Sequence, residues 1–228
     1  MRRRDLAKFG AAIGLALLLG GCGNNTTTRF RLTVEVETPQ GVRSGSSVIK
    51  VVWHRPGALA RSILGSQASG SYTIRGEAVA VDLPDGQTLF VLLRSPADPD
   101  WPAWVLGQIG HGEVRPVPRR WRYGPGAGTM TENYPWFVRF GDITKPETVE
   151  EVDPDDLAAS FGEGYALKAL TFQRTSDAVT TGIERRFPWW ASYRTKHFDG
   201  TGTISEDMTE PSLSAHLSAG SFSTEFNK

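Results

Sequence analysis

The most regular pattern in the chain is a strict alternation of polar and apolar residues over residues 29–38. The apolar positions of this run are Phe30, Leu32, Val34 and Val36. Because successive side chains of a β-strand point to opposite faces, a period of two predicts a strand with one buried face. A turn sequence at 39–41 and a second β-branched run from Ser47 to Trp53 follow, so the two runs are predicted to pair antiparallel.

A second pair of strands is predicted farther along the chain. The run from Tyr72 to Leu83 reads as one long strand, and Gln87 to Leu93 reads as the strand that returns beside it. Between them, Pro84-Asp85-Gly86 is a strong turn signal, because proline presets one backbone angle and glycine accepts left-handed ones. Further strand-like runs lie at residues 136–140, 165–174 and 219–226.

Short helices are predicted where start signals meet apolar residues at helical spacing. Asp153 suits the N-cap and Pro154 the first position of a helix that Gly162 ends. Other candidates for short helices lie at residues 98–109, 145–147 and 180–186. Residues 56–65 carry apolar residues at helical spacing, and both a short helix and a looping edge are open there.

The pattern as a whole predicts the fold class. Many short antiparallel strands, separated by Gly/Pro turns, indicate a mainly β fold, sandwich-like or an open barrel, with a few short helices. An α+β fold is the alternative. Residues 111–134 hold three prolines and several glycines. We expect a long loop there, of the kind that is functional or disordered.

The first 21 residues form a separate pattern. A basic start over residues 2–8 precedes an apolar run from Phe9 to Leu19. That run has about half of the roughly 20 residues that a membrane-spanning helix needs, so it fits a removable secretory signal better than a permanent span. Gly20 and Gly21 then lead to Cys22, the only cysteine of the chain.

The stretch Leu19-Gly20-Gly21-Cys22 resembles the lipobox of bacterial lipoproteins. The resemblance implies that the thiol of Cys22 takes a diacylglyceryl group, that the chain is cut before Cys22, and that the new amino group is acylated. Two or three acyl chains anchor a protein stably, whereas one binds a membrane only marginally. A buried free cysteine and an uncleaved apolar N-terminus are the alternatives.

The same resemblance predicts a location in the bacterial cell envelope. Gly23 resembles lipoproteins that are sorted to the outer membrane, where the protein would face the periplasm. Residues 3–8 resemble a twin-arginine export signal, and a generic basic start is equally open. Residues 22–28 would form a polar tether, and residues 29–228 are expected to form one domain. That domain resembles uncharacterised envelope lipoproteins of Gram-negative bacteria, without the motif of a particular family.

Charge and motif content exclude several classes of protein. The chain holds 25 basic and 25 acidic residues, and removal of residues 1–21 takes away four basic and one acidic, which leaves 21 and 24, a net charge of −3. That balance offers no basic footprint for nucleic acid. A single lipidated cysteine forms no disulfide. The sequence has no P-loop, no Gly-x-Ser-x-Gly and no paired-cysteine zinc motif, so no cofactor and no metal is predicted.

Catalytic chemistry has weak support in the sequence. The acidic run Glu147–Asp156 lacks calcium-loop spacing, and helix capping explains part of it. The histidines are scattered, although chain order does not fix a site: His54, His111, His197 and His216. Ser47-Val48-Ile49-Lys50 matches the Ser-x-x-Lys of penicillin-binding proteins, but it lies in a strand-like run rather than at a helix start.

The stretch Arg119-Arg120-Trp121-Arg122-Tyr123 is the strongest candidate for a binding site. Guanidinium groups hold anions, and aromatic rings stack on flat faces. Outside the cytoplasm its partners would be lipid head groups, anionic polysaccharide or an envelope protein. A solvated loop with Trp121 in the core is the alternative. We expect Trp189-Trp190 in the core rather than in a sugar-stacking patch.

The sequence therefore predicts a membrane-anchored envelope lipoprotein, joined to a bilayer through acylated Cys22. We expect it to act by binding or as a structural module rather than as an enzyme. An envelope hydrolase whose site assembles in space is the alternative. A pocket that joins a histidine and a carboxylate near a serine or threonine would favour that alternative.

Overall fold

The computed structural model describes residues 25–65, 70–96, 98–106, 114–118, 120–121, 131–132, 134–202 and 212–224. These ranges confirm the predicted fold class: the protein is mainly β, with two larger antiparallel sheets that do not close into a barrel, and short helices. Two compact units are present, residues 1–27 with 52–73 and residues 28–51 with 74–228. Three strands, at residues 25–37, 43–54 and 71–75, have residues in both units, so this division does not test whether residues 29–228 form one domain. The expectation of a single domain stays a prediction.

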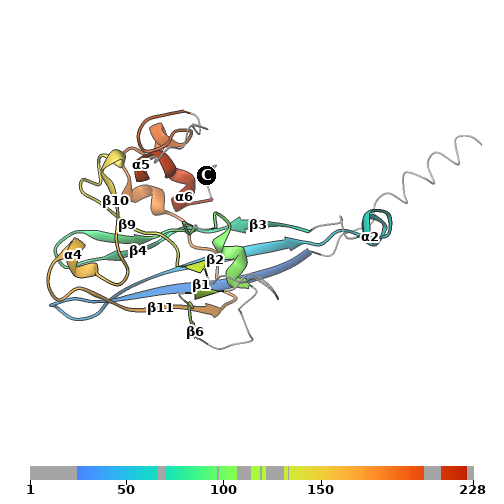
Figure 1. Ribbon diagram of the computed structural model, residues 1–228, viewed down its shortest axis with the longest axis horizontal. Coiled ribbons are helices and arrows are strands. Elements are labelled where there is room, and N and C mark those ends of the chain that lie inside the picture. The colour runs from blue at the N-terminus through green and yellow to red at the C-terminus, as the bar shows by residue number, and fades with distance from the viewer. Residues whose placement is uncertain are drawn as a thin grey trace, which may run out of the picture. The chain divides into compact units, whose positions relative to one another are not determined.

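Five strands form the first sheet, in the order β3-β2-β1-β11-β6 (Figure 1). Their bounds are β1 Asn25–Glu37, β2 Arg43–His54, β3 Ser71–Arg75, β6 Arg115–Pro116 and β11 Ala166–Arg174. β1 pairs antiparallel with β11, and Phe30 lies opposite Arg174. The four apolar residues of the alternating run are all 0% exposed, so the predicted buried face of β1 is confirmed.

Four strands form the second sheet, in the order β10-β9-β5-β4. Their bounds are β4 Val79–Asp82, β5 Thr88–Val91, β9 Phe137–Phe140 and β10 Val149–Glu151. β4 and β5 pair around the predicted Pro84-Asp85-Gly86 turn, where the N–H of Leu83 donates to the carbonyl of Gln87 at 2.9 Å. The prediction of this hairpin is therefore confirmed for its inner part.

The prediction of one long strand over residues 72–83 is wrong. Its first part is β3 of the first sheet, and its last part is β4 of the second. The chain changes sheets at Gly76, whose φ of +153° favours glycine and whose added Cβ would lie 3.1 Å from Ile49. A second glycine, Gly45 of β2, allows the first sheet to approach the second closely. A Cβ at this position would collide with the carbonyl oxygen of Ala80 on β4.

The helices are short and none of those described is long and apolar enough to cross a membrane. The α-helices are α2 Ala58–Leu64, α3 Trp101–Leu106, α4 Leu157–Phe161, α5 Leu213–His216 and α6 Ala219–Phe222. The 3-10 helices are η2 Pro146–Thr148, η3 Ile183–Arg186 and η4 Trp190–Tyr193. α2 settles the open choice at residues 56–65 in favour of a helix, and α3, η2 and η3 lie in segments where short helices are predicted.

Two local predictions are wrong because of capping side chains. The N-cap of α4 is Asp156, which accepts from the N–H of Ala159 at 3.1 Å, and not Asp153. Residues 219–222 form α6 instead of the predicted last strand, because Ser218 and Ser221 form a reciprocal capping box there.

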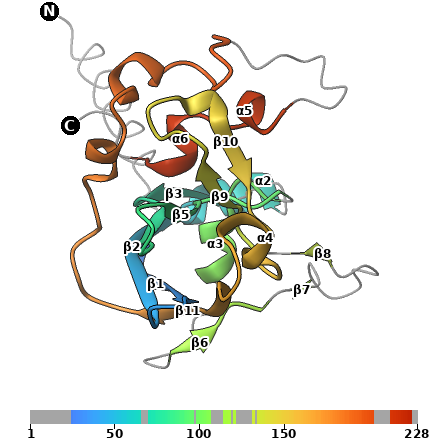
Figure 2. The same ribbon diagram turned by 90° about the vertical axis from the view of Figure 1, so that its left-hand side faces the viewer.

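An aromatic core joins the second sheet to the C-terminal segments. Phe90 and Phe140 contribute from the sheet, Phe187 and Trp189 from around η3 and η4, and Phe222 from α6. Trp189 is 6% exposed, as expected for a core residue, and Trp190 packs partly buried against the same cluster. α5 lies beside β10 (Figure 2). Because so many rings are interlocked, these short helices are held by packing more than by their own propensity.

Candidate functional site

Cys22, the predicted lipidation site, lies outside the described residues, as do the signal residues before it. β1 begins at Asn25, three residues after Cys22 and four residues before the predicted strand. Residues 25–28, expected as tether, are therefore strand. The first described strand therefore begins three residues after the residue that the lipobox resemblance assigns to the bilayer.

The basic and aromatic stretch contains a strand where the sequence predicts a loop. Arg120-Trp121 is β7, and it pairs antiparallel with β8, Thr131–Glu132, so that Arg120 lies opposite Glu132. Upstream, the N–H of Val117 donates to Leu170 of β11 at 2.9 Å, which ties this segment to the first sheet. Arg119, Arg122 and Tyr123 lie outside the described residues. The assignment of a binding site to this stretch stays a prediction.

One histidine, His54 at the end of β2, is held between two polar side chains. Its Nδ1 lies 3.1 Å from Asn25 Oδ1, and its Nε2 lies 3.0 Å from Thr73 Oγ1. An amide oxygen only accepts, so Nδ1 donates to Asn25 and Nε2 accepts from the Thr73 hydroxyl. This order, hydroxyl to imidazole to orienting group, is the geometry of an activated nucleophile.

The chemistry of this trio is weaker than its geometry. Its third member, Asn25, is a neutral amide rather than a carboxylate, so it does not stabilise an imidazolium by charge. Asn25 and Thr73 are exposed, and the three residues come from the adjacent strands β1, β2 and β3. A cross-strand polar ladder at the end of the sheet accounts for the same contacts.

The other histidines form no comparable arrangement in the described residues. Nδ1 of His197 is buried without a hydrogen-bond partner in the described part of the chain, while the backbone N–H of His197 donates to Thr201. The ring of His216 lies 6.4 Å from that of Trp136. His111 lies outside the described residues. Within the described ranges, no group of three His, Cys, Asp or Glu side chains could hold a metal ion.

The carboxylates of the acidic run Glu147–Asp156 take part in separate structural contacts. Glu150 pairs with Arg139 at 2.7 Å, and Asp153 accepts from the N–H of Asp155 at 2.8 Å. Burial, and then the charge of Asp153, raise the pKa of Glu151, while a hydrogen bond from Trp136 acts in the other direction. The run therefore stabilises a strand pair and a turn rather than forming one acidic site.

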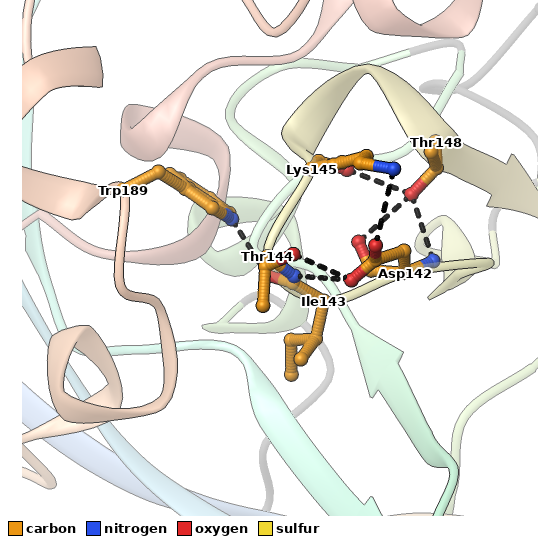
Figure 3. A network of polar contacts seen from close by, with 6 residues as sticks. All are labelled: Asp142, Ile143, Thr144, Lys145, Thr148 and Trp189. Atoms are coloured by element: carbon orange, nitrogen blue, oxygen red, sulfur yellow. Dashed lines mark hydrogen bonds and ion pairs between the residues drawn. The ribbon is translucent and has the colours of Figure 1, made fainter.

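In the loop between β9 and β10, polar side chains form a hydrogen-bond network that holds the backbone of the loop (Figure 3). Asp142 accepts from the N–H of Thr144 at 2.9 Å and from its hydroxyl at 2.7 Å, and these bonds lower the pKa of Asp142. Thr148 accepts from the N–H of Asp142 at 3.0 Å. The indole of Trp189 donates to the carbonyl of Ile143 at 2.8 Å. The network fixes the loop over the aromatic core.

Glu77 is a buried carboxylate that sequence reasoning missed. It is 2% exposed and accepts from the N–H groups of Gly182 at 2.7 Å and Ile183 at 3.0 Å. Its own carbonyl accepts from the hydroxyl of Ser47 at 2.7 Å. Ser47, the serine of the Ser-x-x-Lys match, thus donates a structural hydrogen bond from β2. The only sequence signal for this role of Glu77 was its position directly after Gly76, where the strand-like pattern of residues 72–83 is interrupted.

Comparison with known proteins gives no relative: no protein-family model, no curated protein and no solved structure matches this chain.

Proposed function

We propose that the protein is a lipid-anchored envelope protein whose β fold acts as a binding or structural module close to a membrane surface. The observation that carries the proposal is the lipobox stretch, with the sole cysteine at its end. The start of β1 supports it. Asn25 lies three residues after Cys22, a separation of at most about 10 Å, so an acylated Cys22 would hold the end of β1 next to the bilayer.

Binding is favoured over catalysis by what the buried polar groups do. Glu77 closes hydrogen bonds between distant segments, and Trp189 fixes a loop, so these groups have structural partners. The partner class predicted for residues 119–123 is anionic: lipid head groups, polysaccharide or an acidic face of an envelope protein. Placed on a short tether, such a stretch would act at the membrane surface.

The experiment is metabolic labelling with palmitate followed by fractionation of cells that express the full chain. We expect the wild-type protein and an Asn24→Ala control to incorporate label and to sediment with membranes. Cys22→Ser removes the acylated thiol, and we expect it to lose the label and the membrane association. Labelling of Cys22→Ser at the wild-type level would contradict the proposal.

A second candidate, an envelope hydrolase, has one observation in its favour: the hydroxyl of Thr73 lies 3.0 Å from Nε2 of His54. A fluorophosphonate probe, which reacts with activated hydroxyls, tests it. Under this alternative the probe labels Thr73, and His54→Ala abolishes the labelling. An unlabelled Thr73 in the wild-type protein would remove the alternative.

A further inference from the structure

The helix α2 carries two neighbouring apolar side chains on an exposed surface. Ile63 is 70% exposed and Leu64 is 54% exposed, which makes them two of the few large apolar side chains exposed in the described part of the chain. Arg61 and Ser62, which precede them on the helix, are exposed as well. A single exposed leucine needs no explanation, but an adjacent pair on a solvent-facing helix indicates a surface that meets an apolar phase.

The two chain segments that flank α2 pack against each other. The rings of Trp53 and Tyr72 stack with their centroids 5.8 Å apart and their planes 20° apart. A Cβ on Gly70 would lie 2.9 Å from the carbonyl of His54 and equally close to the Trp53 ring, so the returning chain is pressed against this pair. The helix itself is closed by the N–H of Gly65, which donates to Arg61. The apolar pair is thus presented by a defined element.

Asn25, from which the chain leads back to Cys22, belongs to the same compact unit as α2. Asn25 contacts His54 at 3.1 Å, and both belong to the unit formed by residues 1–27 and 52–73. From that contact, three residues lead back to Cys22 and four lead forward to the start of α2 at Ala58. Segments of this length reach at most about 10 and 14 Å. Acyl chains on Cys22 would therefore hold the bilayer surface within reach of α2.

Charge is distributed unevenly in a way that fits a membrane surface. The mature part of this unit, residues 22–27 and 52–73, contains Arg55 and Arg61 and no acidic residue, a net charge of +2. The mature chain has a net charge of −3, so the remainder carries −5. Anionic lipids attract exposed arginines and repel an acidic surface. Trp53 and Tyr72, which stack on each other in the segments before and after α2, are also of the types enriched at membrane interfaces.

We propose that α2 docks on the bilayer that holds acylated Cys22, with Ile63 and Leu64 entering the boundary between head groups and acyl chains and Arg55 and Arg61 contacting anionic head groups. The proposal rests on the lipid anchor proposed above. Docking of α2 would be a second contact with the bilayer. The lipid anchor alone leaves the protein free to rotate about the anchor, whereas the anchor and α2 together would fix its orientation relative to the membrane.

The test places a polarity-sensitive fluorophore on α2 of the full lipoprotein. In the acylated protein the sulfur of Cys22 is a thioether, so a cysteine introduced by Ile63→Cys is the only free thiol. The labelled protein is reconstituted into vesicles of phosphatidylethanolamine and phosphatidylglycerol that contain a nitroxide-labelled lipid. Ser62→Cys is the matched control, because one residue along an α-helix turns the side chain by about 100°.

We expect blue-shifted emission from position 63 and nitroxide quenching at least about twofold stronger there than at position 62. Leu64→Cys should behave like Ile63→Cys, which guards against a local defect of one variant. Replacement of phosphatidylglycerol by phosphatidylcholine should reduce the quenching, because Arg55 and Arg61 lose their anionic partners.

Two failures are distinguishable in this experiment. Protein that floats with the vesicles but shows equal emission and quenching at positions 62, 63 and 64 has an anchor and no docked helix, which overturns this proposal alone. Protein that does not float with the vesicles has no lipid anchor, which overturns the proposed function and the docking of α2 with it.

Discussion

The carboxylate of Glu77 accepts a hydrogen bond of 2.7 Å from the backbone N–H of Gly182, which lies 105 residues later in the chain. A second bond from Ile183 makes the acceptor bidentate toward the start of η3. Burial raises the pKa of Glu77 above its ordinary value, and the two backbone donors only partly offset this. Glu77 follows Gly76, where the chain passes from one sheet to the other. Its carboxylate therefore connects this point to the segment after Gly182, which contributes Phe187 and Trp189 to the aromatic core.

Removal of this carboxylate should destabilise the fold. Glu77→Ala leaves the buried N–H of Ile183 and the partly buried N–H of Gly182 without an acceptor, so we expect a loss of about 1–3 kcal/mol in the free energy of unfolding. Urea denaturation measures it. Glu184→Ala, which removes an exposed glutamate two residues from Gly182, is the control, and we expect it to change stability by less than about 0.5 kcal/mol.

The pH dependence of that loss has a definite sign. Because the folded pKa of Glu77 is raised, its stabilising contribution is complete below the unfolded value of 4.5 and declines as the pH rises through the folded pKa. The deficit of Glu77→Ala relative to the wild type should therefore be largest in acid and smaller at neutral pH. A deficit that grows from pH 4 to pH 7 would show that this carboxylate is not disfavoured by burial.

Asp82 of β4 and Arg186 of η3 form a two-point ion pair, with distances of 2.6 and 2.9 Å. Hydrogen bonding from Arg186 lowers the pKa of Asp82, so the contribution of the pair is present above the unfolded value of 3.8 and is lost as the pH falls through the folded pKa. Both side chains are partly exposed. We expect a coupling of about 0.5–1 kcal/mol.

A double-mutant cycle of Asp82→Asn and Arg186→Ala at neutral pH measures that coupling. It should shrink in 1 M salt, because screening acts strongly on exposed charges. A coupling that is indistinguishable from zero at low salt would mean that the pair is only a geometric coincidence of the surface.

We predict that the basic and aromatic residues 119–123 bind anionic ligands. Replacement of Arg119, Arg120 and Arg122 by alanine removes three positive charges, and we expect affinity for anionic polysaccharide or anionic vesicles to fall by about tenfold or more. Circular dichroism should show an unchanged fold. The control removes three exposed basic residues elsewhere: Arg43, Arg194 and Lys196. Equal losses in both variants would show that only net charge matters.

Much of the sheet structure was predictable, because local pattern and burial agree there. In β1 the alternation from Phe30 to Val36 matches a face that is 0% exposed. The turn at Pro84-Asp85-Gly86 carries its own backbone chemistry, so it and the β4–β5 pair were predictable as well.

What the sequence did not predict depends on partners far along the chain. The run 72–83 looks continuous, and the change of sheet at Gly76 follows from the packing of Ile49 against it. Residues 219–222 have strand-like composition, but the capping box of Ser218 and burial of Phe222 in the aromatic core make a helix. Glu77 could not be recognised, because its partners Gly182 and Ile183 are brought to it only by the fold.

The central claim is that Cys22 is acylated and becomes the first residue of the mature protein. Intact-mass spectrometry of the protein extracted from membranes tests it most directly. The account predicts a chain of residues 22–228 whose mass exceeds that of the polypeptide by a diacylglyceryl group, with or without a further acyl chain on the amino group. An unmodified chain that retains residues 1–21, or a mature chain with a free Cys22 thiol, would contradict it.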